Sequence, residues 1–230
     1  MMAEKKRIYL MRHAKPDLPM NGRVYYGQTD YPLAPQGTAA AEETGEYLKG
    51  KITFDYLYAS DMIRAQQTAK LAAPYLPITT VPALREVNLG EWEGRGYDEV
   101  REQFREIYEA RGVKFAEVAP PGGETFRELQ RRTVPAFEEI ESAHKSGNIL
   151  IVAHGAAIWS IMARCFGFDL NDMFFFPQDY CGIHVVEPAG GRMRLCQYNW
   201  QPLLKAAGEN IRGLYGLQKV AERWGEIGAV

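Results

Sequence analysis

The chain has 230 residues, which is enough for one large domain with room for a subdomain or a tail. Its 27 basic and 29 acidic residues give a net charge of −2 without a basic run, which argues against nucleic acid and against an anionic membrane as partners. Three cysteines without a short paired spacing disfavour a disulfide framework and a zinc site. The first apolar run, residues 8–11, is too short for a signal peptide or a membrane span, and we therefore expect a cytoplasmic protein.

Short apolar runs alternate with longer amphipathic segments along the chain. The patterns predict strands at residues 7–11, 56–59, 78–81 and 149–153 and helices at residues 37–49, 62–75, 125–145 and 156–166. A turn at residues 188–191 joins segments 182–187 and 192–198, which predicts a β-hairpin. The sequence thus indicates a three-layer α/β/α sandwich, whose mostly parallel sheet has an antiparallel edge strand.

A polar segment at residues 97–111, followed by the Pro- and Gly-rich stretch 119–123, interrupts this alternation. We interpret residues about 95–124 as a helical cap on a domain that occupies residues 1–200. Residues 201–230 are predicted to form a C-terminal helical extension. Its apolar residues recur at spacings near three and four, which favours a helix packed on the body or a contact in a homodimer. They are Leu203, Leu204, Ile211, Leu214, Leu217, Val220 and Trp224.

One arginine and two histidines stand where predicted strands end. Arg12 and His13 follow the first strand, and His154 follows the strand at 149–153. Ligands of open α/β sheets bind beyond the carboxyl ends of the strands, so neighbouring strands would bring both imidazoles into one pocket. A neutral imidazole can attack phosphorus, while a protonated one and an arginine hold the phosphoryl oxygens. The alternative for His13 is a strand-end residue whose ring is satisfied by the backbone.

A second arginine and a group of acids follow in similar settings. Ser60 or Asp61 is the predicted N-cap of the helix at 62–75, which puts Arg64 in the first turn. A cation there is unfavourable for the helix dipole, and a bound anion would compensate. A partly desolvated carboxyl group near that anion would have a raised pKa, as a general acid requires. Composition alone does not choose among the three candidates, Glu86, Glu91 and Glu93.

Five motifs, in their order and spacing, resemble the histidine phosphatase superfamily, also called phosphoglycerate-mutase-like. They are Arg12-His13-Ala14, Ser60-Asp61 with Arg64-Ala65, Leu84-Arg85-Glu86 with Leu89-Gly90, Pro121-Gly122-Gly123-Glu124-Thr125 and Val152-Ala153-His154-Gly155. The resemblance covers residues 7 to about 198, and the stretch 26–33 is most similar to the alpha-ribazole phosphatase and broad-specificity phosphatase branch. It implies His13 as the phosphorylated nucleophile and Glu86 as the proton donor. The phosphate pocket that it implies contains no metal or other cofactor and consists of Arg12, Arg64 and His154.

The chain also departs from the family. Many members read Arg-His-Gly-Glu-Thr where residues 12–16 read Arg-His-Ala-Lys-Pro, and no residue obviously replaces an asparagine that contacts the phosphate in those members. Cofactor-dependent mutases carry a longer, arginine-bearing insertion and a mobile basic tail. The arginines of the shorter insertion here are spaced as on a solvated helix face, and they are Arg95, Arg101, Arg105 and Arg111.

We therefore expect a metal-independent phosphomonoesterase that hydrolyses a small phosphorylated metabolite through a phosphohistidine on His13. The insertion and the loop that contains Gln28 and Thr29 would recognise the leaving group. A phosphoglycerate mutase and a catalytically silent scaffold of the same fold are the alternatives. A dinuclear metallophosphatase is disfavoured because the four histidines form no His-x-His or Asp-x-His pair.

Overall fold

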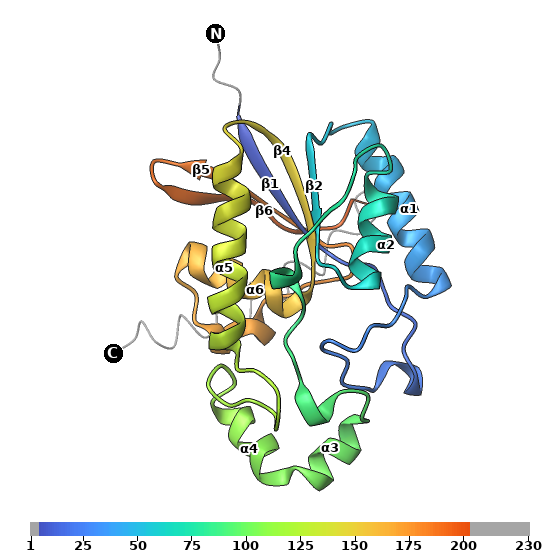
Figure 1. The fold of residues 1–230 in the computed structure, drawn as a ribbon, viewed down its shortest axis with the longest axis vertical. Helices are drawn as coiled ribbons and strands as arrows, with labels where there is room; N and C mark the ends of the chain where they lie inside the picture. Colours follow the sequence, from blue (N-terminus) through green and yellow to red (C-terminus); the bar gives the residue numbers. More distant parts are fainter. Residues whose placement is uncertain (1–4, 203–230) are drawn as a thin grey trace.

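The computed structural model describes residues 5–202, and a six-stranded sheet in the order β3-β2-β4-β1-β5-β6 forms its centre (Figure 1). The first four of these strands are parallel, β5 is antiparallel to β1, and β6 is antiparallel to β5. The predicted antiparallel edge is therefore confirmed. The strands are β1 (Lys6–Arg12), β2 (Tyr56–Ala59), β3 (Thr79–Thr80), β4 (Gly147–Ala153), β5 (Ile183–Ala189) and β6 (Arg192–Trp200).

Helices cover both faces of the sheet and complete the predicted three-layer sandwich (Figure 1). α1 and α2 pack on the face to which β4 contributes Leu150 and Val152, while α5 and α6 pack on the face with Ile149 and Ile151. Both faces of β4 are thus buried, which explains why its sequence is apolar without alternation. The four helices are α1 (Pro35–Lys49), α2 (Ile63–Ala72), α5 (Phe126–Ala143) and α6 (Gly155–Phe166).

The segment between β3 and α5 forms the projection at the bottom of Figure 1. Its helical part is broken at Phe104 into α3 (Tyr97–Gln103) and α4 (Arg105–Val113). Arg111 corrects the expectation of a solvated helix face. It is only 8% exposed, and its guanidinium carbon lies 4.2 Å from the ring centre of Phe115. Short 3-10 turns complete the described chain, and they are η1 (Met20–Gly22), η2 (Pro82–Leu84), η3 (Gly90–Trp92) and η4 (Leu170–Phe175).

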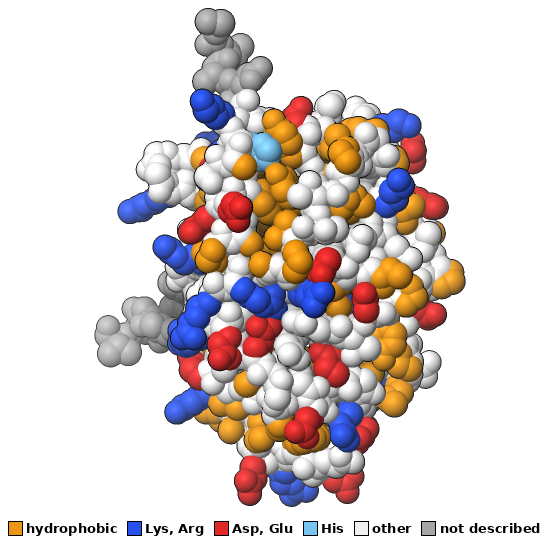
Figure 2. All heavy atoms as spheres, in the orientation of Figure 1, with side chains coloured by type: hydrophobic (Ala, Val, Ile, Leu, Met, Phe, Trp, Pro, Cys, Tyr) orange, Lys and Arg blue, Asp and Glu red, His pale blue; other side chains and the backbone are white. Residues whose placement is uncertain are grey.

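On the face shown in Figure 2, acidic and basic side chains are interspersed, and neither charge dominates. Within residues 5–202, no helix combines the length and the apolarity that crossing a bilayer requires. The predicted extension at 201–230 lies almost entirely outside the described residues. Its packing and the homodimer contact therefore stay predictions.

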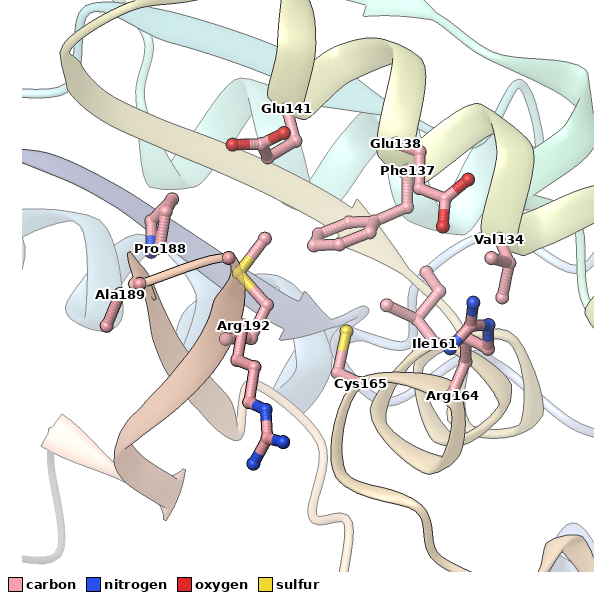
Figure 3. A pocket seen from close by; sticks show the side chains of 13 residues that line it. Val134, Phe137, Glu138, Glu141, Ile161, Arg164, Cys165, Pro188, Ala189 and Arg192 are labelled. Atoms are coloured by element: carbon pink, nitrogen blue, oxygen red, sulfur yellow. The ribbon is translucent and has the colours of Figure 1, made fainter.

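A cavity of about 700 Å³ lies between α5, α6 and the turn of the β5–β6 hairpin (Figure 3). Phe137, Ile161 and Cys165 line it, together with charged side chains such as Arg164 and Glu138. Because β5 is antiparallel to β1, this turn lies beyond the amino end of β1. The cavity is therefore at the opposite end of the sheet from the predicted strand-end histidines.

Candidate active site

The two strand-end histidines meet as the sequence predicts. β1 and β4 are direct neighbours, with Arg12 opposite Ala153, and the His13 backbone N–H donates to the Ala153 carbonyl at 2.9 Å. The ring centres of His13 and His154 are 5.0 Å apart. Both side chains are almost completely buried, at 1% and 0% exposure. The carboxyl ends of two parallel strands thus build one histidine pair.

The hydrogen bonds of His13 fix its tautomer. Nδ1 lies 2.7 Å from the carbonyl oxygen of Ala14, and a carbonyl only accepts, so Nδ1 carries the proton. Nε2 therefore carries no proton, and its lone pair accepts from Nε–H of Arg64 at 3.3 Å. Burial, and then the charges of Arg64 and Arg12, hold the pKa of His13 well below its usual range. His13 is thus a neutral imidazole with Nε2 available for bond formation.

His154 is buried without hydrogen bonds at either ring nitrogen among the described residues. Buried polar atoms without a partner are uncommon in proteins, and they often mark a site for water, an ion or a substrate. Burial, followed by the charge of Arg64, holds the pKa of His154 well below its usual range. A phosphate dianion in the pocket would oppose this effect and favour the protonated ring.

Arg64 lies in the first turn of α2, as predicted, but the N-cap prediction is wrong. Met62 precedes the helix without a side-chain cap, and the N–H of Ile63 donates to the carboxylate of Asp30 at 2.9 and 3.1 Å. Asp61 instead pairs with Arg85. The helix is capped by a residue more than thirty positions earlier in the chain, which local spacing cannot reveal.

The guanidinium of Arg64 is held by backbone. Its Nη1 donates to the Thr29 carbonyl at 2.9 Å, and Nη2 donates to the Gly27 carbonyl at 2.7 Å. The side chain is fully buried, and Asp30 lies 3.9 Å away across an ion pair. Because an arginine stays charged in proteins, this arrangement places a fixed positive charge beside Nε2 of His13.

Arg12 provides a second cation with a free donor. Its Nη1 donates to the Gln178 carbonyl, while its buried Nε has no partner among residues 5–202. The ring of Tyr180 lies over its guanidinium, 4.2 Å from ring centre to Cζ. The Tyr180 hydroxyl is in turn hydrogen bonded to that of Tyr26 at 2.8 Å. Sequence reasoning did not single out Tyr180, which lies just before β5 (Ile183–Ala189).

Glu86 reaches the start of α6. Its Oε1 accepts from the N–H of Val87 at 2.8 Å, and Oε2 accepts from the N–H of Ala156 at 3.2 Å. A Cβ on Gly155 would lie 3.6 Å from Nε of Arg12 and 3.9 Å from Oε2 of Glu86, so both groups border this glycine. Burial raises the pKa of Glu86, although the two backbone hydrogen bonds and the nearby arginines oppose that effect.

Glu93 has a different role from Glu86. Its carboxylate accepts from the backbone N–H groups of Gln28 at 2.6 Å and Thr29 at 2.9 Å, and from the Thr29 hydroxyl at 2.6 Å. The Gln28 side chain donates to the Glu86 carbonyl at 3.0 Å. Gln28 and Thr29 therefore border the site with their polar groups engaged by protein, and their contact with substrate stays a prediction. The sequence around Glu93 did not predict that its carboxylate would bind the backbone of Gln28 and Thr29.

The arrangement collects a neutral nucleophilic imidazole, a second imidazole, two guanidinium groups and a carboxyl group with a raised pKa. Within residues 5–202, no group of three or more His, Cys, Asp or Glu side chains is arranged to hold a metal ion. The profile of the histidine phosphatase superfamily (branch 1) matches residues 8–201. The chain belongs to this superfamily.

Other members of the histidine phosphatase superfamily include phosphatases and mutases. The adenosylcobalamin/alpha-ribazole phosphatase of Escherichia coli (strain K12) is 29% identical over 175 residues, which cover 75% of this chain and 85% of that protein. A 2,3-bisphosphoglycerate-dependent phosphoglycerate mutase of Bradyrhizobium is 28% identical over 166 residues, or 69% of this chain and 80% of the mutase. The crystal structure of the alpha-ribazole phosphatase from Shigella flexneri superimposes with a TM-score of 0.77 at 26% identity, covering 85% of this chain and 96% of that one.

Proposed function

We propose that the protein is a metal-independent phosphomonoesterase that forms a phosphohistidine on His13. The observation that carries this proposal is the 2.7 Å contact between Nδ1 of His13 and the Ala14 carbonyl. It places the proton on Nδ1 and leaves the lone pair of Nε2 directed at the buried guanidinium of Arg64. A phosphoryl group bound there would have its oxygens beside the cations and its phosphorus beside the nucleophile. Such positioning, together with stabilisation of charge in the transition state, provides most of the catalysis in phosphoryl transfer.

The reaction would proceed in two steps. In the first, Nε2 of His13 forms a bond to phosphorus as the bond to the leaving oxygen breaks, and protonated Glu86 gives its proton to that oxygen. In the second, water attacks the phosphohistidine, the carboxylate of Glu86 accepts a proton, and phosphate leaves with His13 restored. In both steps Arg12, Arg64 and His154 would hold the non-bridging phosphoryl oxygens.

The substrate would be a small phosphorylated metabolite. The relatives named as adenosylcobalamin/alpha-ribazole phosphatases support phosphatase activity. The relatives named as phosphoglycerate mutases make phosphoryl transfer between two positions of one substrate the competing activity. The loop containing Gln28 contacts the Glu86 carbonyl and the Arg64 guanidinium, and it would recognise the leaving group together with the insertion.

A panel of phosphorylated metabolites, assayed for phosphate release in the presence of a chelator, tests the proposal. We expect turnover that is insensitive to the chelator and abolished in His13→Ala. Metal-dependent turnover, or full turnover by His13→Ala, would contradict it. The ranking of kcat/KM across the panel would name the substrate class, and absence of turnover on every monoester would favour the silent scaffold.

A further inference from the structure

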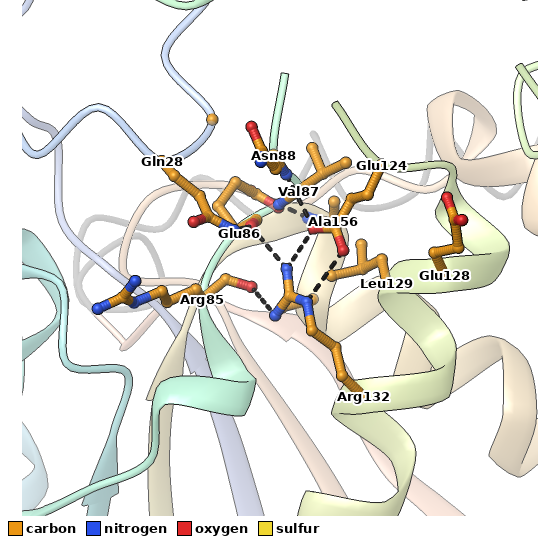
Figure 4. A network of polar contacts seen from close by, with 12 residues as sticks. Gln28, Arg85, Glu86, Val87, Asn88, Glu124, Glu128, Leu129, Arg132 and Ala156 are labelled. Atoms are coloured by element: carbon orange, nitrogen blue, oxygen red, sulfur yellow. Dashed lines mark hydrogen bonds and ion pairs between the residues drawn. The ribbon is translucent and has the colours of Figure 1, made fainter. Parts of the chain in front are cut away.

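The backbone that carries Glu86 is irregular, and one side chain from another element holds it. Residues 83–88 begin inside the 3-10 turn η2 (Pro82–Leu84) and form no strand. Arg132, in the second turn of α5, points its guanidinium into this segment (Figure 4). Its side chain is only 26% exposed, although arginines on the outer face of a helix are usually solvated.

Three backbone carbonyls of the segment accept from Arg132. Nη1 donates to Ala83 and to Arg85, each at 2.8 Å, and Nη2 donates to Glu86 at 2.8 Å (Figure 4). The guanidinium also pairs with Glu124 through Nε at 3.1 Å and through Nη2. All of these bonds are charge-assisted and come from one planar group, which is the geometry that arginine offers and lysine does not.

Glu124 extends the same network to the other side of Glu86. Its Oε1 accepts from the backbone N–H of Asn88 at 2.8 Å. The network thus fixes the peptide groups on both sides of Glu86. The carbonyl of Glu86 itself accepts twice, from Arg132 and from the Gln28 side chain. The backbone that carries the Glu86 side chain is therefore held, while the carboxyl group itself accepts from the N–H groups of Val87 and Ala156.

We propose that Arg132 is the positioning residue for the proton donor of this enzyme. By binding the carbonyls of residues 83, 85 and 86, it holds the Glu86 carboxyl group at the distance and angle from which it protonates the leaving oxygen. Arg132 itself contacts no reacting atom in this proposal. The inference rests on the proposed role of Glu86 and goes beyond it, because it assigns the geometry of the acid to a residue on α5.

The test compares two leaving groups in five variants. 4-Nitrophenyl phosphate releases a phenolate that needs no proton, whereas an alkyl phosphate requires one. Arg132→Met and Arg132→Lys are assayed with Glu86→Gln and with the double variant Glu86→Gln/Arg132→Met. Arg127→Met is the matched control, because Arg127 lies on the same helix and pairs with Glu117 but does not bind residues 83–88. Urea unfolding of each variant is measured alongside.

We expect Arg132→Met to lower kcat/KM for the alkyl phosphate roughly tenfold more than for 4-nitrophenyl phosphate, with Arg132→Lys showing the same bias to a smaller extent. The double variant should be no more selective than Glu86→Gln alone, because residues that act as one unit are not additive. Arg127→Met should leave the ratio of kcat/KM for the alkyl phosphate to kcat/KM for 4-nitrophenyl phosphate unchanged.

Two results would overturn the proposal, and they are distinguishable. If Glu86→Gln discriminates between the substrates but both Arg132 variants lose activity equally on both, Arg132 supports only the fold. If Glu86→Gln itself fails to discriminate, the proton-donor role of Glu86 fails, and the positioning role fails with it. Because the readout is a ratio of substrates in one preparation, partial unfolding of a variant cancels from it.

Discussion

Nε of Arg64 lies 3.3 Å from Nε2 of His13, so the buried guanidinium donates to the lone pair of the proposed nucleophile. A bound phosphoryl group would have to replace this contact, with its phosphorus meeting Nε2 and one of its oxygens taking the Arg64 donor. The first two predictions follow from this exchange.

The phosphoenzyme should form on His13. A phosphorus–nitrogen bond is labile in acid and stable in base, so rapid quenching with labelled substrate should trap label that survives alkali but not acid. Peptide mapping checks the site. Label on His154, or steady turnover without any trapped label under single-turnover conditions, would reject His13 as the nucleophile.

Arg64→Ala should lower kcat/KM by about 30- to 1000-fold, or about 2–4 kcal/mol, for every substrate irrespective of its leaving group. The reason is that the guanidinium contacts the transferred group, which all substrates share. Arg85→Ala is the control, because Arg85 is an exposed arginine whose carboxylate partner is Asp61. A loss at Arg64 that varied strongly with the leaving group would contradict the assignment, as would an equal loss at Arg85.

The pH dependence should separate acid from nucleophile. Burial raises the pKa of Glu86, and catalysis needs its protonated form, so kcat/KM for an alkyl phosphate should fall as the pH rises through that raised pKa. His13, whose pKa is held well below its usual range, stays neutral and competent at mildly acidic pH. The measurement is the ratio of wild type to Glu86→Gln across pH on one substrate, because substrate ionisation cancels. A ratio that is constant with pH would count against Glu86.

Hydrolysis should exceed transfer. Arg101 and Arg105 are exposed and share a surface hollow with the carboxylates of Asp98, Glu102 and Glu109, which would repel a second phosphate. Arg111 is buried against aromatic rings. With 3-phosphoglycerate and 2,3-bisphosphoglycerate supplied together, we expect phosphate release without appreciable 2-phosphoglycerate. Interconversion of the two monophosphoglycerates that outpaces hydrolysis of every monoester tested would establish a mutase.

His184 should make the protein less stable in acid. Burial lowers the pKa of His184 to about 3, so the folded protein keeps it neutral while the unfolded chain protonates it below a pH of about 6.5. As the pH is lowered from about 6.5 to about 3, the free energy of unfolding should therefore decrease. The contribution of this group is at most about 1.4 kcal/mol per pH unit. His184→Leu should remove that part of the slope in urea titrations at several pH values. Val185→Ala, a core change without titration, should lower stability and leave the slope unchanged.

The sequence predicts the fold and the convergence of the histidines for the same reason. β1 and β4 are buried on both faces, so their apolar runs are easy to recognise, and the residues that end them are the first polar ones in each run. Parallel pairing of such strands brings their ends together. Arg64 could be placed because it lies in the first turn of a recognisable helix that follows a strand.

The remaining parts of the site depend on contacts between distant segments, which leave no local pattern. Asp30 caps α2 from another loop, Glu93 binds the backbone of Gln28 and Thr29, and Arg132 binds the carbonyls around Glu86. In each case a side chain satisfies backbone groups that lack a partner in a helix or a strand ladder, either at the start of α2 or in an irregular segment. Irregular backbone needs such partners because it has no ladder or helix to supply them, and the partner's identity is decided only by the fold.

The pairing of Arg12 with Ala153 makes the separation of the two histidines a property of one strand register. A slip of one residue between β1 and β4 would displace the imidazoles by about 3.3 Å along the strand and turn one of them toward the opposite helix layer. Changes in chain length are tolerated best in exposed loops. We therefore expect insertions and deletions to be tolerated least within Lys6–Arg12 and Gly147–Ala153. A change of even one residue there would separate the two imidazoles, although every side chain of the pocket would still be present.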